Sequence, residues 1–165
     1  MSYITKGKTF KVYIIVDTSS DPPTLVDKDE VTAEELKQNP SWKVEWAEFI
    51  RWDWGVMTEI TKQARIFDEV TGTSSIDWLE LRELKFQYLL KDWSLEDNGK
   101  KLELKRSGNK LDRESEELIK SIDPRIVNAF LNKADRILEF GQKEQDFFIK
   151  STPLTTVQPA EETVK

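Results

Sequence analysis

The sequence contains no cysteine and no histidine. Without cysteine there can be no disulfide bond and no thiol nucleophile, and without both residue types there can be no zinc finger. The absence of histidine removes the side chain that most often transfers protons near neutral pH. Any metal site would have to use oxygen ligands alone. The chain also contains no GxxxxGK(S/T), GxGxxG or GxSxG motif, and we expect a protein that is not an enzyme and that holds no cofactor and no metal.

Long apolar segments are also missing. The longest apolar run, from Val12 to Val16, is far shorter than the roughly 20 residues that cross a bilayer. The start of the chain, MSYITKGKTF, lacks the apolar core of a signal peptide. These features predict a soluble protein of the cytoplasm with no membrane partner.

Basic residues are fewer than acidic residues. The 165 residues include 25 Lys and Arg against 31 Asp and Glu, which gives a formal net charge of −6. Affinity for a phosphate backbone comes from cationic side chains, so an acidic chain is a poor candidate for nucleic-acid binding. A local cationic group is interpreted as the solvated rim of a hairpin rather than as a binding patch. Its members are Lys100, Lys101, Lys105, Arg106 and Lys110.

Two early segments have the alternation of β-strands. Residues 8–16 are rich in β-branched and aromatic side chains, and residues 42–50 alternate in the same way. Between them, Pro22 and Pro23 argue against regular structure. Thr32 and Glu35 have the spacing of a capping box, which predicts a short helix that ends before Pro40.

A helix is predicted over residues 56–70, with Asp53 as a plausible N-cap. Met57, Ile60, Ala64 and Phe67 recur at helical spacing along it. Residues 71–75 are predicted to form a loop, in which Ser74 or Ser75 caps the next helix.

The stretch from Ile76 to Leu104 is central to the predicted fold. Within it, the spacing of apolar residues changes from that of a helix to that of a strand. The helix should stop near Lys91 or Asp92. Asn98-Gly99 then signals a tight hairpin, since both central residues of a type I′ turn need positive φ.

The last part of the chain is predicted to be helical. Asp112 or Ser115 begins a short helix, and Asp123 followed by Pro124 begins a longer one that runs to about Phe140. The expected fold class is therefore α+β, with a small N-terminal sheet, a predominantly helical second half and one β-hairpin. Residues 1–150 are expected to form a single domain, and residues 151–165, rich in Thr, Pro and Glu, a disordered tail.

Patterns that could carry chemistry are few. Asp97, Glu103 and Lys105 have the residue types of one metal-dependent nuclease pattern, but Asp97 falls in the hairpin turn rather than on a separate strand. A calcium loop aligned on Gly99 would place Lys105 where a bidentate Glu belongs. The chain also has six Trp residues. They are suited to core packing, to a protein interface or to stacking on a sugar or base.

The order of elements from about residue 42 to residue 140 resembles that of the tail assembly chaperones of long-tailed (siphovirus-type) bacteriophages. The residues that carry the resemblance are the run from Trp93 to Leu102, WSLEDNGKKL, and the run from Ile122 to Phe130, IDPRIVNAF. The resemblance implies a protein of the host cytoplasm that binds the long, helical tape-measure protein and recruits tail-tube subunits. It also implies that the protein is absent from the finished virion.

We place the expected partner contacts at Trp52, Trp54, Phe86 and Tyr88. The expected partners are the tape-measure protein and, as a second candidate, the tail-tube protein, and a homo-oligomer is also compatible with the sequence. The alternative function is that of a structural or accessory phage virion protein that acts through protein–protein contacts. A nucleic-acid-cleaving enzyme is a third class, and Glu103 would be its test residue.

Overall fold

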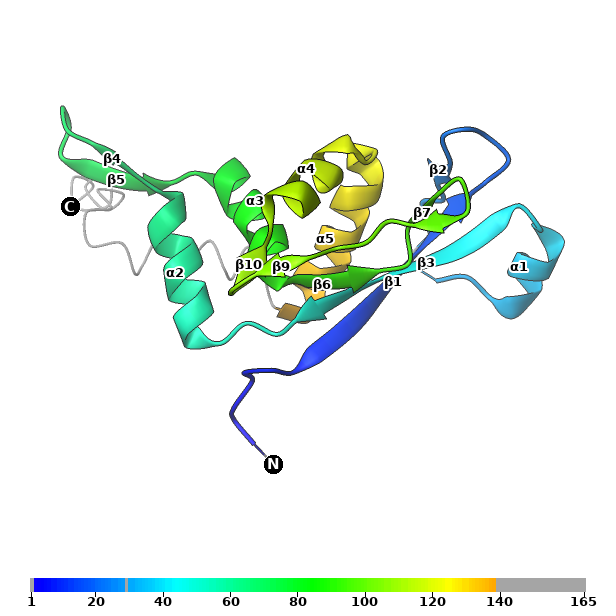
Figure 1. Ribbon diagram of the computed structural model, residues 1–165, viewed down its shortest axis with the longest axis horizontal. Helices are drawn as coiled ribbons and strands as arrows, with labels where there is room; N and C mark the ends of the chain where they lie inside the picture. The colour runs from blue at the N-terminus through cyan, green and yellow to red at the C-terminus, as the bar shows by residue number, and fades with distance from the viewer. Residues whose placement is uncertain (1, 29, 139–165) are drawn as a thin grey trace, which may run out of the picture.

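The computed structural model describes residues 2–28 and 30–138 (Figure 1). The chain folds as mixed α+β, as predicted. Its elements are β1 (Thr9–Asp17), β2 (Thr24–Leu25), α1 (Ala33–Gln38), β3 (Trp42–Ile50), α2 (Trp54–Ala64), β4 (Arg65–Asp68), β5 (Thr73–Ile76), α3 (Trp78–Leu89), β6 (Leu90–Trp93), β7 (Glu96–Asp97), β8 (Lys100–Lys101), β9 (Arg106–Ser107), β10 (Lys110–Leu111), α4 (Arg113–Ser121) and α5 (Pro124–Leu138). None of these helices is long and apolar enough to cross a membrane.

The central sheet has four antiparallel strands in the order β2-β1-β3-β6. β1 and β3 pair along their whole length, from Thr9 opposite Ile50 to Asp17 opposite Trp42. Both strands occupy the segments that the alternation predicts. β2 was not expected, because it begins directly after Pro23. Proline fixes its own φ but leaves the next residue free to pair, and Leu25 lies opposite Val16.

One face of the sheet packs on helices and the other meets solvent. Val12, Ile14 and Val16 of β1 are buried, and so are Ala47 and Phe49 of β3. The opposite face of β3 carries its tryptophans, and the Lys11 Nζ lies 4.0 Å from the ring centroid of Trp46. An antiparallel sheet covered on one side has this division. The tryptophans of β3 therefore lie on the face away from the main core.

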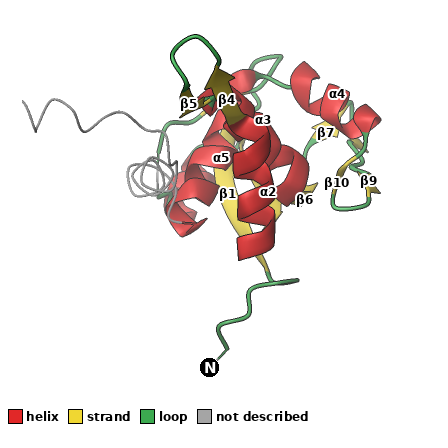
Figure 2. Ribbon diagram, turned by 90° about the vertical axis from the view of Figure 1, so that its left-hand side faces the viewer, coloured by secondary structure: helices red, strands yellow, loops and turns green. Residues whose placement is uncertain are grey.

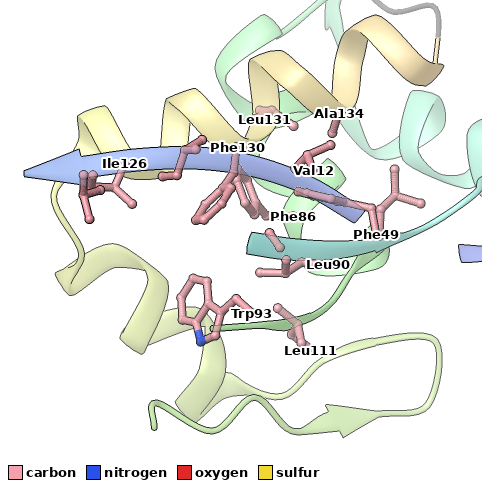
Figure 3. Packing of buried hydrophobic residues seen from close by; sticks show 14 residues of the cluster. Val12, Phe49, Phe86, Leu90, Trp93, Leu111, Ile126, Phe130, Leu131 and Ala134 are labelled. Atoms are coloured by element: carbon pink, nitrogen blue, oxygen red, sulfur yellow. The ribbon is translucent and has the colours of Figure 1, made fainter. Parts of the chain in front are cut away.

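The main core lies between the sheet, α3 and α5 (Figure 3). Phe130, Leu131 and Ala134 of α5 are buried, and the Trp93 ring of β6 is fully buried near Leu111. The Trp93 indole N–H donates to the Leu102 carbonyl at 2.7 Å, so its only polar atom is satisfied. This side chain anchors the segment after the hairpin to the core.

A second apolar cluster joins α2 to α3. It contains Ile60 and Ala64 of α2 with Leu81 and Leu84 of α3. Phe86 and Leu89 of the same helix belong to the main core. α3 is therefore buried on two sides, which explains why its apolar residues do not form a single stripe.

The helix starts follow the predicted capping chemistry in most cases. The Thr32–Glu35 capping box forms, and Asp53 accepts a hydrogen bond from the Val56 amide. The predicted caps Ser74 and Ser75 are wrong, because Asp77 caps α3 by accepting from the amides of Leu79 and Glu80. Of the two candidates for α4, Asp112 is the cap.

The predicted helix over residues 56–70 is too long. α2 ends at Ala64, and the next residues form β4, which pairs with β5 in a hairpin. The Asp77 amide donates to the Ala64 carbonyl at 2.8 Å and closes this hairpin at its base. The hairpin projects from the body beyond α2 and α3 in both views (Figures 1 and 2).

The hairpin predicted at Asn98-Gly99 forms between β7 and β8. Asn98 has φ +51° and Gly99 has φ +77°, as a type I′ turn requires. A second ribbon, β9–β10, replaces the predicted loop at residues 106–110. The expected helix end at about Phe140, the remainder of the domain to residue 150 and the predicted tail at 151–165 lie outside the described residues.

Candidate partner-binding groove

The four predicted contact residues do not form one surface. Trp52 and Tyr88 are half-buried and pack against both apolar clusters. The Tyr88 hydroxyl accepts from the Gln63 amide nitrogen at 2.7 Å, which holds its ring beside α2. Trp54, the first residue of α2, is 69% exposed. Trp54 is thus the one member of this set that presents most of its side chain to solvent.

Phe86 belongs to the core rather than to an exposed contact surface. It is only 5% exposed, and its ring centroid lies 5.9 Å from that of Phe49. Phe86 is mostly covered because α3 packs on the sheet on this side as well as on α2, and its contact with a partner stays a prediction. The small exposed part of Phe86 contributes to a groove.

This groove lies between α3, α4 and the first half of α5, and its volume is about 340 Å³. Figure 1 shows these three helices next to one another on the same side of the sheet. The apolar lining comes from all three helices and from the link between α4 and α5. Its residues are Leu79, Phe86, Ile119, Ile122, Pro124, Val127 and Leu131.

The charges around the groove balance. Arg82 and Glu83 come from α3, and Glu116 and Lys120 come from α4. The Arg82 guanidinium donates to the Asn128 side-chain oxygen at 2.9 Å and so spans from α3 to α5. The groove therefore offers an apolar floor with a polar, electrically neutral rim.

A buried ion pair fixes the two walls formed by α3 and α5. Lys85 is 4% exposed, and its Nζ lies 3.4 Å from Oδ1 of Asp135. Burial raises the pKa of the Asp135 carboxyl, while the charge of Lys85 opposes that rise. The pair resists sliding of one helix along the other, because separation would leave buried charge uncompensated.

Leu79 is an exposed apolar residue of the groove that the sequence did not single out as a contact. It lies in the first turn of α3, lines the groove and is 77% exposed. Its place in the groove follows from the position of α4 and α5, which local spacing does not reveal. The apolar run Leu118, Ile119 and Ile122 followed by Val127 was the available signal, since it marks an amphipathic corner.

The residues of the nuclease-like and calcium-loop patterns form no metal site in the part of the chain that the structure describes. In residues 2–28 and 30–138, no group of three or more acidic residues is placed to hold a metal ion. Lys105, from the nuclease-like pattern, lies with its Nζ 4.0 Å from the exposed Glu114 carboxylate. Lys101 of the cationic group pairs with Asp92 at 3.1 Å.

No protein-family model, curated protein or solved structure matches this chain. Membership of the tail assembly chaperones therefore stays a prediction from the order of residues. The apolar groove between α3, α4 and α5 is the structural feature on which the proposed function rests.

Proposed function

We propose that this protein is an assembly chaperone that binds a long helical partner through the groove between α3, α4 and α5. More specifically, we propose a tail assembly chaperone of a long-tailed bacteriophage. It would bind the tape-measure protein in the host cytoplasm and promote assembly of the tail tube.

The apolar groove is the observation that carries this proposal. Proteins often recognise an amphipathic helix by receiving its apolar face in a groove lined by helices. Here Ile119, Val127 and Leu131 supply the floor, and the exposed Leu79 extends it to the edge. The balanced rim suits a partner that is itself of mixed charge, because neither sign is repelled.

The test is co-expression with the tape-measure protein of the same phage, followed by affinity capture and size-exclusion chromatography with light scattering. A tape-measure protein that is insoluble alone and soluble in the complex would support the proposal. The light-scattering mass would also show whether the chaperone is a homo-oligomer. A protein that captures no tape-measure protein and that occurs in purified virions would instead be a structural or accessory virion protein.

Two matched variants locate the contact. Leu79→Glu places a charge at the groove, and Val70→Glu makes the same change at the tip of the β4–β5 hairpin, where Val70 is 96% exposed. Neither residue is buried, so both variants should fold. We expect Leu79→Glu to reduce capture strongly and Val70→Glu to leave it unchanged. Equal capture by both variants would exclude the groove as the contact.

A further inference from the structure

A second cavity lies on the other side of the α4–α5 corner, and its volume is about 380 Å³. The connection from β1 to β2, the β7–β8 hairpin and the start of α5 enclose it. Its apolar lining includes Val16, Leu95, Leu102, Leu118, Ile122 and Ile126. Ile122 also lines the groove, so the two sites lie back to back across this residue.

The charged residues that line this cavity are all acidic. They are Asp21, Glu45, Glu96, Asp97 and Asp123. The cavity therefore differs from the groove, whose charged residues balance. Its acidic lining predicts a negative potential directly above an apolar floor.

Part of this charge is neutralised within the protein. Lys43 Nζ lies 3.0 Å from Glu45 Oε1 and 3.6 Å from Glu96 Oε2, and Arg125 pairs with Asp123 at 2.8 Å. Ser94 donates its hydroxyl hydrogen bond to the buried Glu45 carboxylate. These three acids already have partners.

Asp21 and Asp97 remain. Both are exposed, and neither forms an ion pair with any residue in the described part of the chain. Within residues 2–28 and 30–138, these two carboxylates of the cavity lining form no ion pair, although Lys100 lies opposite Asp97 in the β7–β8 pairing. Each can pair with a cation from another molecule without losing an internal contact.

We infer that this cavity binds a Lys- or Arg-bearing amphipathic segment of a partner protein. The methylene stem of a Lys or Arg side chain lies on the apolar floor, and its charged head meets Asp21 and Asp97. The acidic mouth selects a cationic segment, and the floor selects a segment with apolar neighbours. The inference does not depend on the proposed function, because it uses the opposite side of the α4–α5 corner.

The probe is a short amphipathic helical peptide built from Leu, Ala and Lys, titrated against the full-length protein by calorimetry. Two matched peptides carry Glu in place of Lys, or Ser in place of Leu. We expect saturable binding of the Leu/Lys peptide alone, and weaker binding at higher salt because exposed charges are screened. Equal binding of the Glu peptide, or no saturable binding of the Leu/Lys peptide, would overturn the inference.

Charge-removing variants then locate the site. The double variant Asp21→Asn/Asp97→Asn should raise the dissociation constant by about fivefold, the scale expected when two exposed charge pairs are lost. The control Glu34→Gln/Glu69→Gln removes the same net charge from two exposed positions that do not line the cavity. It should bind the peptide as the wild type does. If both double variants weaken binding equally, the peptide recognises only the net negative charge of the protein, and the assignment to this cavity is wrong.

Discussion

Lys85 of α3 and Asp135 of α5 face each other inside the protein, with the lysine Nζ 3.4 Å from the carboxylate Oδ1. Each comes from a helix that is otherwise apolar where it meets the core. The pair sets the register between these helices, because a shift would separate the buried lysine from the half-buried carboxylate of Asp135. The groove depends on that register, since α3 and α5 form two of its walls.

Replacing the lysine should therefore cost stability. Lys85→Met removes the cation that faces Asp135 and leaves the carboxylate buried without it. We expect a loss of about 3 kcal/mol in the free energy of unfolding, measured with urea at neutral pH. The double variant Lys85→Met/Asp135→Asn should recover much of this loss. A double variant no more stable than Lys85→Met would show that packing by the lysine stem, rather than charge, is responsible.

The same variant should change the dependence of stability on pH. Burial raises the pKa of Asp135 above its ordinary value, so the folded state takes up the proton at a higher pH than the unfolded state. The free energy of unfolding therefore falls as pH rises from the unfolded pKa through the folded pKa. Without Lys85 the folded pKa should rise further and extend this window upward. Urea unfolding of both proteins across mildly acidic pH would measure the difference, and parallel profiles would contradict it.

The cap of α3 offers a local test. Asp77 accepts hydrogen bonds from the amides of Leu79 and Glu80, each at 3.1 Å. Asp77→Ala should lower the free energy of unfolding by about 1 kcal/mol, because two helix amides lose their acceptor. Asp77→Asn keeps an acceptor oxygen and should lose less. Thermal unfolding followed by circular dichroism would rank the three proteins, and an unchanged Ala variant would show that water replaces the cap.

Two tryptophans in opposite environments form a matched pair. Trp93 is fully buried with its indole N–H bonded to the Leu102 carbonyl, whereas Trp54 is mostly exposed. Trp93→Phe leaves a gap and an unpaired carbonyl, so we expect a loss of about 2 kcal/mol. Trp54→Phe should change stability by no more than about 0.5 kcal/mol. Urea unfolding followed by circular dichroism measures both, and similar losses would contradict the burial difference.

The β7–β8 turn depends on a backbone conformation that favours glycine. Gly99 has φ +77°, and no neighbouring atom lies within 4 Å of an added Cβ. Gly99→Ala should therefore lower stability by about 1 kcal/mol through backbone strain and not through a clash. Thermal unfolding provides the measurement. Gly99→Asn should be milder, since asparagine tolerates positive φ better than alanine does.

The elements that the sequence predicts correctly are those fixed by interactions within a short segment of the chain. β1 and β3 follow from alternation, and the Thr32–Glu35 box and the Asn98-Gly99 turn follow from hydrogen bonds between near neighbours. The end of α2 does not, because Phe67 fits the helical spacing as well as it fits β4. Pairing with β5, which closes where Asp77 meets Ala64, decides between the two structures.

The candidate site was harder to predict for the same reason. Phe86 and Tyr88 both lie on one apolar helix, and spacing alone does not show which sides of that helix are covered. The groove exists only where α3, α4 and α5 meet, so no single segment encodes it. The place of Leu79 beside the groove depends on that meeting, although its apolar character is visible in the sequence.

The order of the chain has a consequence for synthesis. β1 is made first among the strands, but the side chains that cover its apolar face come largely from α5, the last of the described elements. A nascent chain must therefore carry the pair β1–β3 with that face open to water until the α5 segment has left the ribosome. During this interval the chain exposes an apolar sheet surface that is prone to aggregate and that cellular chaperones can shield. Slowing translation just before Pro124 should lengthen that exposure and lower the yield of soluble protein.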